Sequence, residues 1–235
     1  MIPALMSHRP HRPPDWEAID TVLLDMDGTL LDLRFDNHFW LEHLPARWAA
    51  LHGREPAAAR EELLARYREV EGTLAWYCVE HWSRALAVDV VELKREVEHL
   101  IRFLPDSLDF LAALRQAGKR VVLATNAHPY SLALKAEKTG LGGHFDVLVS
   151  AHEFGVPKEH PKFWASLQAR IGYDPPRTLF LDDSLPILRA ARDYGHIGHL
   201  VSMLRPDSAQ PLRARAEFAA VLRLGELLPV LPSGA

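Results

Sequence analysis

Short apolar runs alternate along this chain with longer segments in which apolar residues recur every three or four positions. The runs have the length and composition of buried strands and cover residues 21–25, 120–125, 146–150, 178–182 and, less clearly, 197–203. The helix-like segments end at glycines, which accept the left-handed conformation of a helix C-terminus: Gly118, Gly140, Gly172 and Gly195. This alternation predicts an α/β fold with a doubly wound, mostly parallel sheet.

The interval 32–104 departs from this alternation, because it has helical periodicity and no convincing strand. Its clearest pattern is an apolar stripe on a predicted helix that begins at Pro56, formed by Leu63, Tyr67, Val70, Leu74 and Tyr77. The interval leaves the core just after the first strand, at the sheet edge where ligands of such folds bind. We therefore expect an all-helical insertion that covers the site as a cap.

These patterns divide the chain into a core, a cap and two irregular ends. We expect the core to consist of residues 16–31 and 105–225, the cap of 32–104, and the irregular termini of 1–15 and 226–235. The tail after residue 205 also predicts one helix around 214–227.

Composition narrows the functional classes. The 235 residues are 48% hydrophobic, enough for a well-buried core, and the net charge of -4 argues against a nucleic-acid polymer as partner. The single cysteine, Cys78, excludes an internal disulfide and is expected as buried filler in a helix. No apolar run is long enough to span a bilayer, so we expect a cytoplasmic protein without a membrane partner; the oligomeric state stays open.

Paired carboxylates follow the first predicted strand. Residues i and i+2 of a strand share a face, so Asp25 and Asp27 point the same way, and Gly28 lets the backbone turn and approach a ligand. Such a pair can bind a hard cation, attack phosphorus and transfer a proton. The competing interpretation is an ordinary Asp-Gly turn that ends the strand.

Two further polar positions follow in chain order. Thr125 and Asn126 end the second strand before a helix, where a hydroxyl and free backbone N–H groups can hold phosphate oxygens or only cap the turn. Lys158 lies in a loop before the next helix and can neutralise phosphate charge; Lys162, on that helix, is a weaker candidate. Most loop lysines are simply solvated.

A second acidic pair, Asp182 and Asp183, follows the fourth strand. Together with Asp25 and Asp27 it forms an oxygen-rich set suited to Mg²⁺, whereas zinc more often uses His or Cys. A helix cap by Asp183 or Ser184 is the alternative, but it does not explain a second carboxylate pair at the matching edge of the same sheet.

The four motifs, taken in order, resemble those of the haloacid dehalogenase (HAD) superfamily. The resemblance implies a three-layer α/β/α Rossmann-like core with a helical cap. It also implies that Asp25 is the nucleophile, Asp27 the general acid and base, and that Thr125 and Lys158 hold the phosphoryl group. The Mg²⁺ ligands would be Asp25, the Asp27 carbonyl and Asp183, with Asp182 direct or through water. Dehalogenases of the superfamily lack the second aspartate, so Asp27 favours phosphate esters as substrates.

Segments of the cap resemble the bacterial HAD-type nucleotidases that act on GMP and IMP. The resemblance rests on residues 31–40, 76–78 and 82–83 of the cap, with 125–129 and 157–159 of the core. It implies a purine nucleoside 5'-monophosphate as the small phosphorylated substrate. Gly28, Asn126, Arg34 and Asn37 are the expected substrate contacts, with Trp40, Trp76, Tyr77 and Trp82 as candidate stacking faces or as the cap's own core. Phosphatases of sugar or organic-acid phosphates and phosphomutases remain alternatives.

Overall fold

The computed structural model describes residues 14–233 and contains a six-stranded parallel sheet. The strand order is β3-β2-β1-β4-β5-β6, and every neighbouring pair runs parallel. The strands are Thr21–Leu24 (β1), Arg120–Thr125 (β2), Val147–Ser150 (β3), Thr178–Asp182 (β4), His199–Met203 (β5) and Ala219–Val221 (β6). The predicted parallel α/β fold is therefore confirmed.

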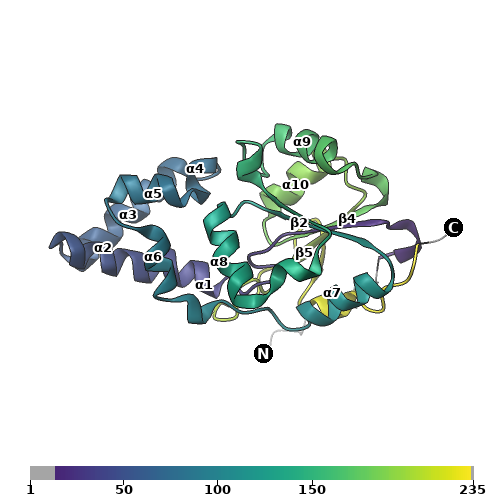
Figure 1. Ribbon diagram of the computed structural model, residues 1–235, viewed down its shortest axis with the longest axis horizontal. Helices are drawn as coiled ribbons and strands as arrows, with labels where there is room; N and C mark the ends of the chain where they lie inside the picture. The colour runs from purple at the N-terminus through teal and green to yellow at the C-terminus, as the bar shows by residue number, and fades with distance from the viewer. Residues whose placement is uncertain (1–13, 234–235) are drawn as a thin grey trace, which may run out of the picture.

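Helices cover both faces of the sheet, because successive strand residues point to opposite sides. Leu24 and Leu181 pack on one side with Phe110 of α7, whereas Leu23 and Phe180 pack on the other with the helices α9 and α10. The four helices of these two layers are Ser107–Gln116 (α7), Pro129–Thr139 (α8), Pro161–Ile171 (α9) and Leu185–Asp193 (α10). The result is three layers: in Figure 1, α9 and α10 lie on one side of the sheet and α7 and α8 on the other.

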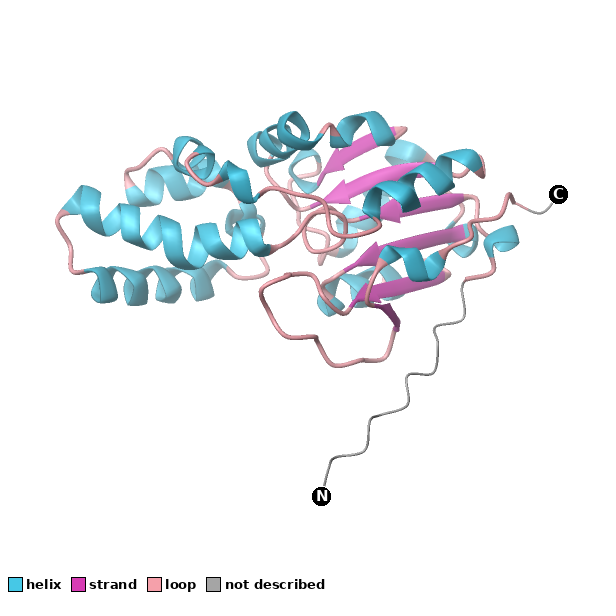
Figure 2. Ribbon diagram, turned by 90° about the horizontal axis from the view of Figure 1, so that it is seen from below, coloured by secondary structure: helices cyan, strands magenta, loops and turns pink. Residues whose placement is uncertain are grey.

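A second group of helices lies at one end of the molecule, beside the carboxyl ends of the strands (Figures 1 and 2). We call this group the helical cap; it comprises Arg34–His38 (α1), Phe39–His43 (η2, a π-helical turn), Leu44–His52 (α2), Pro56–Val70 (α3), Leu74–Tyr77 (α4), Val79–Leu86 (α5), Val90–Arg95 (α6) and Glu98–Leu100 (η3). The arrangement is consistent with the expected insertion, while the expected boundaries at 32 and 104 stay a prediction.

Short 3-10 turns complete the described structure: Trp16–Ala18 (η1), Leu141–His144 (η4), Ala151–Glu153 (η5), Pro175–Arg177 (η6) and Leu224–Leu227 (η7). Of the termini expected to be irregular, residues 1–13 and 234–235 lie outside the described residues. Between residues 14 and 233, no helix combines the length and hydropathy that a membrane crossing requires.

Three local predictions were wrong. The segment 214–227 is not a helix, because Ala219–Val221 pairs with the open edge of β5 and buries Ala220 and Val221. The apolar stripe is divided between α3 and α4, because Gly72 adopts a φ of +75° and interrupts the helix. After α10, the left-handed residue is His196, with a φ of +51°, and not Gly195.

Candidate active site

Three carboxylates converge where β1 and β4 end. The backbone N–H of Asp25 donates to the carbonyl of Leu181 at 3.0 Å, which holds the ends of the two strands side by side. One carboxylate oxygen from each of Asp25, Asp182 and Asp183 lies within 4.8 Å of the other two. All the donors are hard oxygens from acidic side chains, so this group fits Mg²⁺ better than a softer metal.

Lys158 forms the centre of this acidic group. Its Nζ donates to Asp25 Oδ1 at 2.5 Å, to Asp182 Oδ2 at 2.7 Å and to the Ala124 carbonyl at 3.0 Å. The side chain is buried, so these contacts replace the water that the ammonium group loses. Lys158 thus lies against the predicted nucleophile, as the loop position before α9 suggested.

The loop that carries Lys158 is anchored from both sides. The Lys158 backbone N–H donates to Asn126 Oδ1 at 2.8 Å, and the Trp164 indole N–H donates to the Lys158 carbonyl at 2.8 Å. Trp164 is part of the core under α9, so the lysine is fixed by the core and not by a flexible surface loop.

Burial dominates the electrostatics of the acidic group. It raises the pKa of Asp25 and of Asp182 to about 6, although Lys158 opposes both shifts. Burial, reinforced by the charge of Asp25, raises the pKa of Asp183 to about 7. For Lys158, burial favours the neutral amine, but Asp182 and Asp25 outweigh it and hold the pKa above its ordinary value. The group therefore has an excess of negative charge at neutral pH that a bound cation would offset.

The two acids of the second pair are placed differently. Both oxygens of Asp182 are engaged within the protein: Oδ2 accepts from Lys158 and Oδ1 accepts from the Ser184 backbone N–H at 2.8 Å. Asp183 Oδ2 forms an ion pair with Arg213 Nη1 at 3.0 Å. Asp182 is thus fitted to orient Lys158, whereas Asp183 retains more capacity to bind a cation directly.

Asp27 contacts a second buried lysine, Lys135. Lys135 Nζ, from α8, donates to Asp27 Oδ1 and to Asp36 Oδ2, each at 2.6 Å, and Lys94 donates to Asp36 Oδ1 at 3.1 Å. Burial raises the pKa of Asp27 to about 7 against the opposing charge of Lys135. For Asp36, burial also favours the protonated form, but Lys135 and Lys94 together outweigh it and lower the pKa to about 2. Asp27 can therefore hold a proton near neutral pH, which suits an acid-base role.

The remaining core positions lie at the same edge. Thr125 Oγ1 accepts from the Ala127 backbone N–H at 3.0 Å, and Asn126 Nδ2 donates to Glu159 Oε2 at 3.0 Å. Gly28 has a φ of +86°, and a Cβ there would lie 2.8 Å from Asp183 Cγ. The backbone at Gly28 thus lies close to a carboxylate of the site, while its expected approach to a ligand stays a prediction.

A cavity of about 600 Å³ joins this edge to the helical cap. Its walls include residues of both parts, among them Asp25, Asp27, Thr125, Lys158 and Asp183 from the core and Asn37, Trp40, Trp76 and Tyr77 from the cap. This volume is in the range of sites for small molecules. The cavity is therefore large enough for a phosphorylated metabolite.

The expected cap contacts are placed unevenly. Asn37 lines the cavity and donates to Asp207 Oδ2 at 2.7 Å. Arg34 lies outside the lining, and its guanidinium donates to Glu42 at 3.5 Å. Trp82 is buried in the cap core and donates its indole N–H to the Trp76 carbonyl at 3.0 Å. Of the four aromatic candidates, Trp40, Trp76 and Tyr77 therefore face the cavity.

Several residues of the site were missed by sequence reasoning. Lys135 and Lys94 were not singled out from the sequence, although both are buried and a buried lysine indicates a charge partner. Glu159 was noted only beside Lys158, yet it also accepts from the Tyr77 hydroxyl of the cap at 2.9 Å. Arg213 belongs to a segment that was expected to lead into a helix.

Comparisons with known proteins agree with this geometry. GMP/IMP nucleotidase YrfG of Escherichia coli (strain K12) is 45% identical over 193 residues, which cover 82% of this chain and 86% of that protein. Hexitol phosphatase B of the same organism is 26% identical over 69% of this chain and 74% of its own length. A HAD phosphatase structure from Thermococcus onnurineus aligns with a TM-score of 0.74 at 24% identity, covering 89% of this chain and 96% of that one.

A family model supplies the assignment. The model described as haloacid dehalogenase-like hydrolase matches residues 19–195, a span that includes β1 and β4, the cap helices and the loop of Lys158. With this match and the similarity to the nucleotidase, the resemblance noted in the sequence is confirmed: the chain belongs to the haloacid dehalogenase-like hydrolase family.

Proposed function

We propose that this chain is a Mg²⁺-dependent phosphomonoesterase that hydrolyses purine nucleoside 5'-monophosphates, GMP and IMP among them, to nucleoside and phosphate. The main support for purine nucleotides as the substrate class is the 45% identity to a protein named GMP/IMP nucleotidase, over 82% of this chain. The chemistry is supported by the contact of Lys158 with Asp25 beside two further carboxylates.

In the first step, an oxygen of Asp25 attacks phosphorus and the bond from phosphorus to the ribose oxygen breaks. Asp27 gives its proton to that leaving oxygen, which releases the nucleoside and leaves an aspartyl phosphate on Asp25. The pKa of Asp27, raised to about 7 by burial, supports its being protonated at the start of the step.

In the second step, water attacks the phosphorus of the aspartyl phosphate. Asp27, now ionised, takes a proton from that water, and cleavage of the bond between phosphorus and Asp25 releases phosphate and restores the carboxylate. Lys158, with Thr125 and the backbone N–H groups that follow β2, would hold the phosphoryl oxygens during both steps.

Mg²⁺, when bound, would offset negative charge on the transferring phosphoryl group. Asp25, the Asp27 carbonyl and Asp183 would hold it, and the engagement of both Asp182 oxygens supports an indirect role for that residue.

The cap walls support a flat, partly polar substrate. Trp40, Trp76 and Tyr77 line the cavity that also contains Asp25 and Lys158, and each offers an aromatic surface on which a base can stack. Asn37 reaches the same cavity with an amide that can pair with a polar base edge.

Sugar phosphates are the competing substrate class. The observation in their favour is the 26% identity to hexitol phosphatase B, over 69% of the chain. That similarity is lower and shorter than the similarity to the nucleotidase, so we place nucleotides first.

The test is phosphate release from a panel of purine and pyrimidine 5'-monophosphates, hexitol phosphates and hexose phosphates, each with MgCl₂. We expect kcat/KM for GMP and IMP to exceed that for any sugar phosphate by at least about 100-fold. Faster turnover of hexitol phosphates than of GMP and IMP would identify the protein as a sugar phosphatase. Isomerised sugar phosphate without release of phosphate would identify a phosphomutase.

A further inference from the structure

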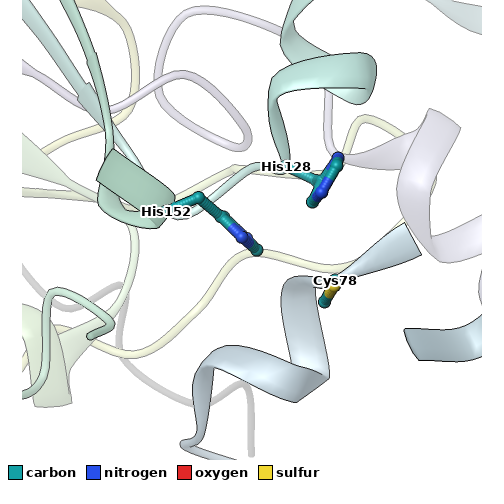
Figure 3. A group of neighbouring side chains, drawn as sticks. All are labelled: Cys78, His128 and His152. Atoms are coloured by element: carbon teal, nitrogen blue, oxygen red, sulfur yellow. The ribbon is translucent and has the colours of Figure 1, made fainter. Parts of the chain in front are cut away.

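A second group of metal-ligating side chains lies between the cap and the core, apart from the carboxylates. Cys78 separates α4 from α5 in the cap, His128 follows β2, and His152 lies in η5 after β3. Figure 3 shows the three side chains approaching one another from these separate segments. One ligand atom from each lies within 4.8 Å of the other two. Cys78 was expected as buried filler in a helix; it is instead half-buried at the N-terminus of α5.

His152 carries the strongest sign of a missing partner. Its Nε2 is buried and has no hydrogen-bond partner among the described residues, which is costly for a polar atom. A metal ion bound at this nitrogen would supply the missing partner.

The two histidines support each other as neutral ligands. Their ring centroids are 4.6 Å apart at an interplanar angle of 77°. Burial, with the adjacent His128, lowers the pKa of His152 to about 4, and burial also lowers the pKa of His128. Both rings are therefore neutral at neutral pH, the form that binds a metal. In His128, Nδ1 accepts a hydrogen bond from the Tyr130 backbone N–H at 3.3 Å, so a metal bound at Nε2 would move the ring proton to Nδ1 and replace that contact.

Cys78 supplies a softer ligand on the cap side. Its Sγ accepts a hydrogen bond from the His81 backbone N–H at 3.4 Å, at the N-terminus of α5. The partial positive charge of a helix N-terminus favours an anionic ligand there. With one sulfur and two imidazole nitrogens, the donor set matches Zn²⁺ and similar transition metals, and not Mg²⁺.

We propose that Cys78, His128 and His152 form a Zn²⁺-type binding site that ties the cap to the core. Zn–S bonds of about 2.3 Å and Zn–N bonds of about 2.0 Å require the ligand atoms to move together by about 1 Å, with water or another ligand in the fourth position. Because the ligands come from one cap segment and two core loops, a bound ion would hold the cap against the core beside the cavity. The proposal does not depend on the identity of the substrate.

Metal binding is measured on the full chain after chelation and dialysis, in the presence of excess MgCl₂. We expect one Zn²⁺ bound per chain, and Co²⁺ in its place should give a sulfur-to-metal charge-transfer band. Cys78→Ser should remove that band, and His152→Asn should weaken Zn²⁺ binding by at least about 100-fold. His99→Asn, which changes an exposed histidine of the cap, is the matched control.

A further variant distinguishes the proposed Zn²⁺ site from the carboxylate site. Asp183→Asn alters the carboxylate group, so the charge-transfer band must persist in it if the thiolate site is distinct. A band that survives Cys78→Ser, or Zn²⁺ binding that is lost only in Asp183→Asn, would overturn the proposal. Circular dichroism confirms that each variant is folded.

Hydrogen exchange tests whether the bound ion holds the cap against the core. Hydrogen exchange of the backbone amides in residues 74–86 should slow when Zn²⁺ is added to the wild type and stay unchanged in Cys78→Ser. Zn²⁺ binding without slower exchange would refute the tie.

Discussion

Lys135 donates a 2.6 Å hydrogen bond to the Oδ1 atom of Asp27, the residue proposed to move protons. The same ammonium donates to Asp36 of the cap, whose other oxygen accepts from Lys94. The acid-base group is therefore the end of a buried chain of alternating charges that crosses from the core into the cap.

Replacing that lysine should move the pH dependence of turnover. Lys135 opposes the burial that raises the pKa of Asp27, so Lys135→Met should raise this pKa further. The acidic limb of the kcat profile reports Asp27 acting as base, and it should shift upward by about one unit or more, with kcat reduced by about 10-fold or more. Lys138→Met, an exposed lysine on the same helix, should leave the profile unchanged. An unshifted pH profile in Lys135→Met would show that Lys135 does not influence proton transfer by Asp27.

Asp25→Asn tests the nucleophile directly. An amide of the same shape cannot form the acyl phosphate, so kcat should fall by at least about 1,000-fold. This substitution also removes a negative charge that pairs with the buried ammonium of Lys158. Circular dichroism and thermal unfolding are therefore needed to confirm that the variant is folded. Appreciable phosphate release by a folded Asp25→Asn enzyme would contradict the proposed role of Asp25 as nucleophile.

Mg²⁺ should stabilise the fold more at neutral than at acidic pH. The pKa values of Asp25 and Asp182 are raised from 3.8 to about 6, and that of Asp183 to about 7. A raised carboxyl pKa contributes stability that is complete below the unfolded value and is lost as pH rises through the folded value. The metal-free chain should therefore lose stability from about pH 4 to pH 7.

A cation that binds the ionised form should restore this loss. Saturating MgCl₂ should raise Tm by about 5 °C or more near pH 7.5, and by much less near pH 5. Addition of EDTA should reverse the gain and abolish phosphate release. Equal Tm gains at both pH values would show that these carboxylates are not the groups through which Mg²⁺ acts.

Gly28→Ala should weaken the metal site through Asp183. The added Cβ would lie 2.8 Å from Asp183 Cγ and 2.9 Å from Pro206 Cβ, on a backbone with a φ of +86°. We expect the Mg²⁺ concentration for half-maximal activity to rise about 10-fold and the free energy of unfolding to fall by about 2 kcal/mol.

Gly53→Ala is the matched control for this substitution. Gly53 also has a positive φ, of +60°, but a Cβ there meets nothing within 4 Å. Its backbone cost should therefore be similar, about 1 kcal/mol, while Mg²⁺ dependence stays that of the wild type. The same change in Mg²⁺ dependence for both variants would contradict the role given to the contact with Asp183.

The carboxylates could be placed from sequence because parallel strands bring their carboxyl ends to one edge. Asp25 follows β1 and Asp182 ends β4, so the strand pairing alone puts them together. The position of Lys158 was less determined by pattern, because a loop lysine has many possible orientations. Its contact with Asp25 depends on the Trp164 and Asn126 hydrogen bonds that fix the loop.

Contacts between the cap and the core could not be predicted in the same way. The pairs Lys135 with Asp36 and Tyr77 with Glu159 join segments whose relative placement no local period encodes. The same holds for Cys78 with His128 and His152. The edge strand β6 was missed for a related reason, because the open edge of β5 imposes extended structure on a segment with helix-favouring composition.

The central position of β1 in the sheet has a consequence for how the chain folds. Thr21 pairs with Arg120 on one side and with Thr178 on the other, so both partners of this strand are synthesised long after it. The cap helices, which lie between β1 and β2 in the sequence, have mainly local contacts and can form early, whereas non-local strand pairing is slow. The strand before Asp25, the proposed nucleophile, therefore stays unpaired until β2 and β4 have been synthesised. The sheet edge that carries the carboxylates thus assembles late, when most of the chain is present.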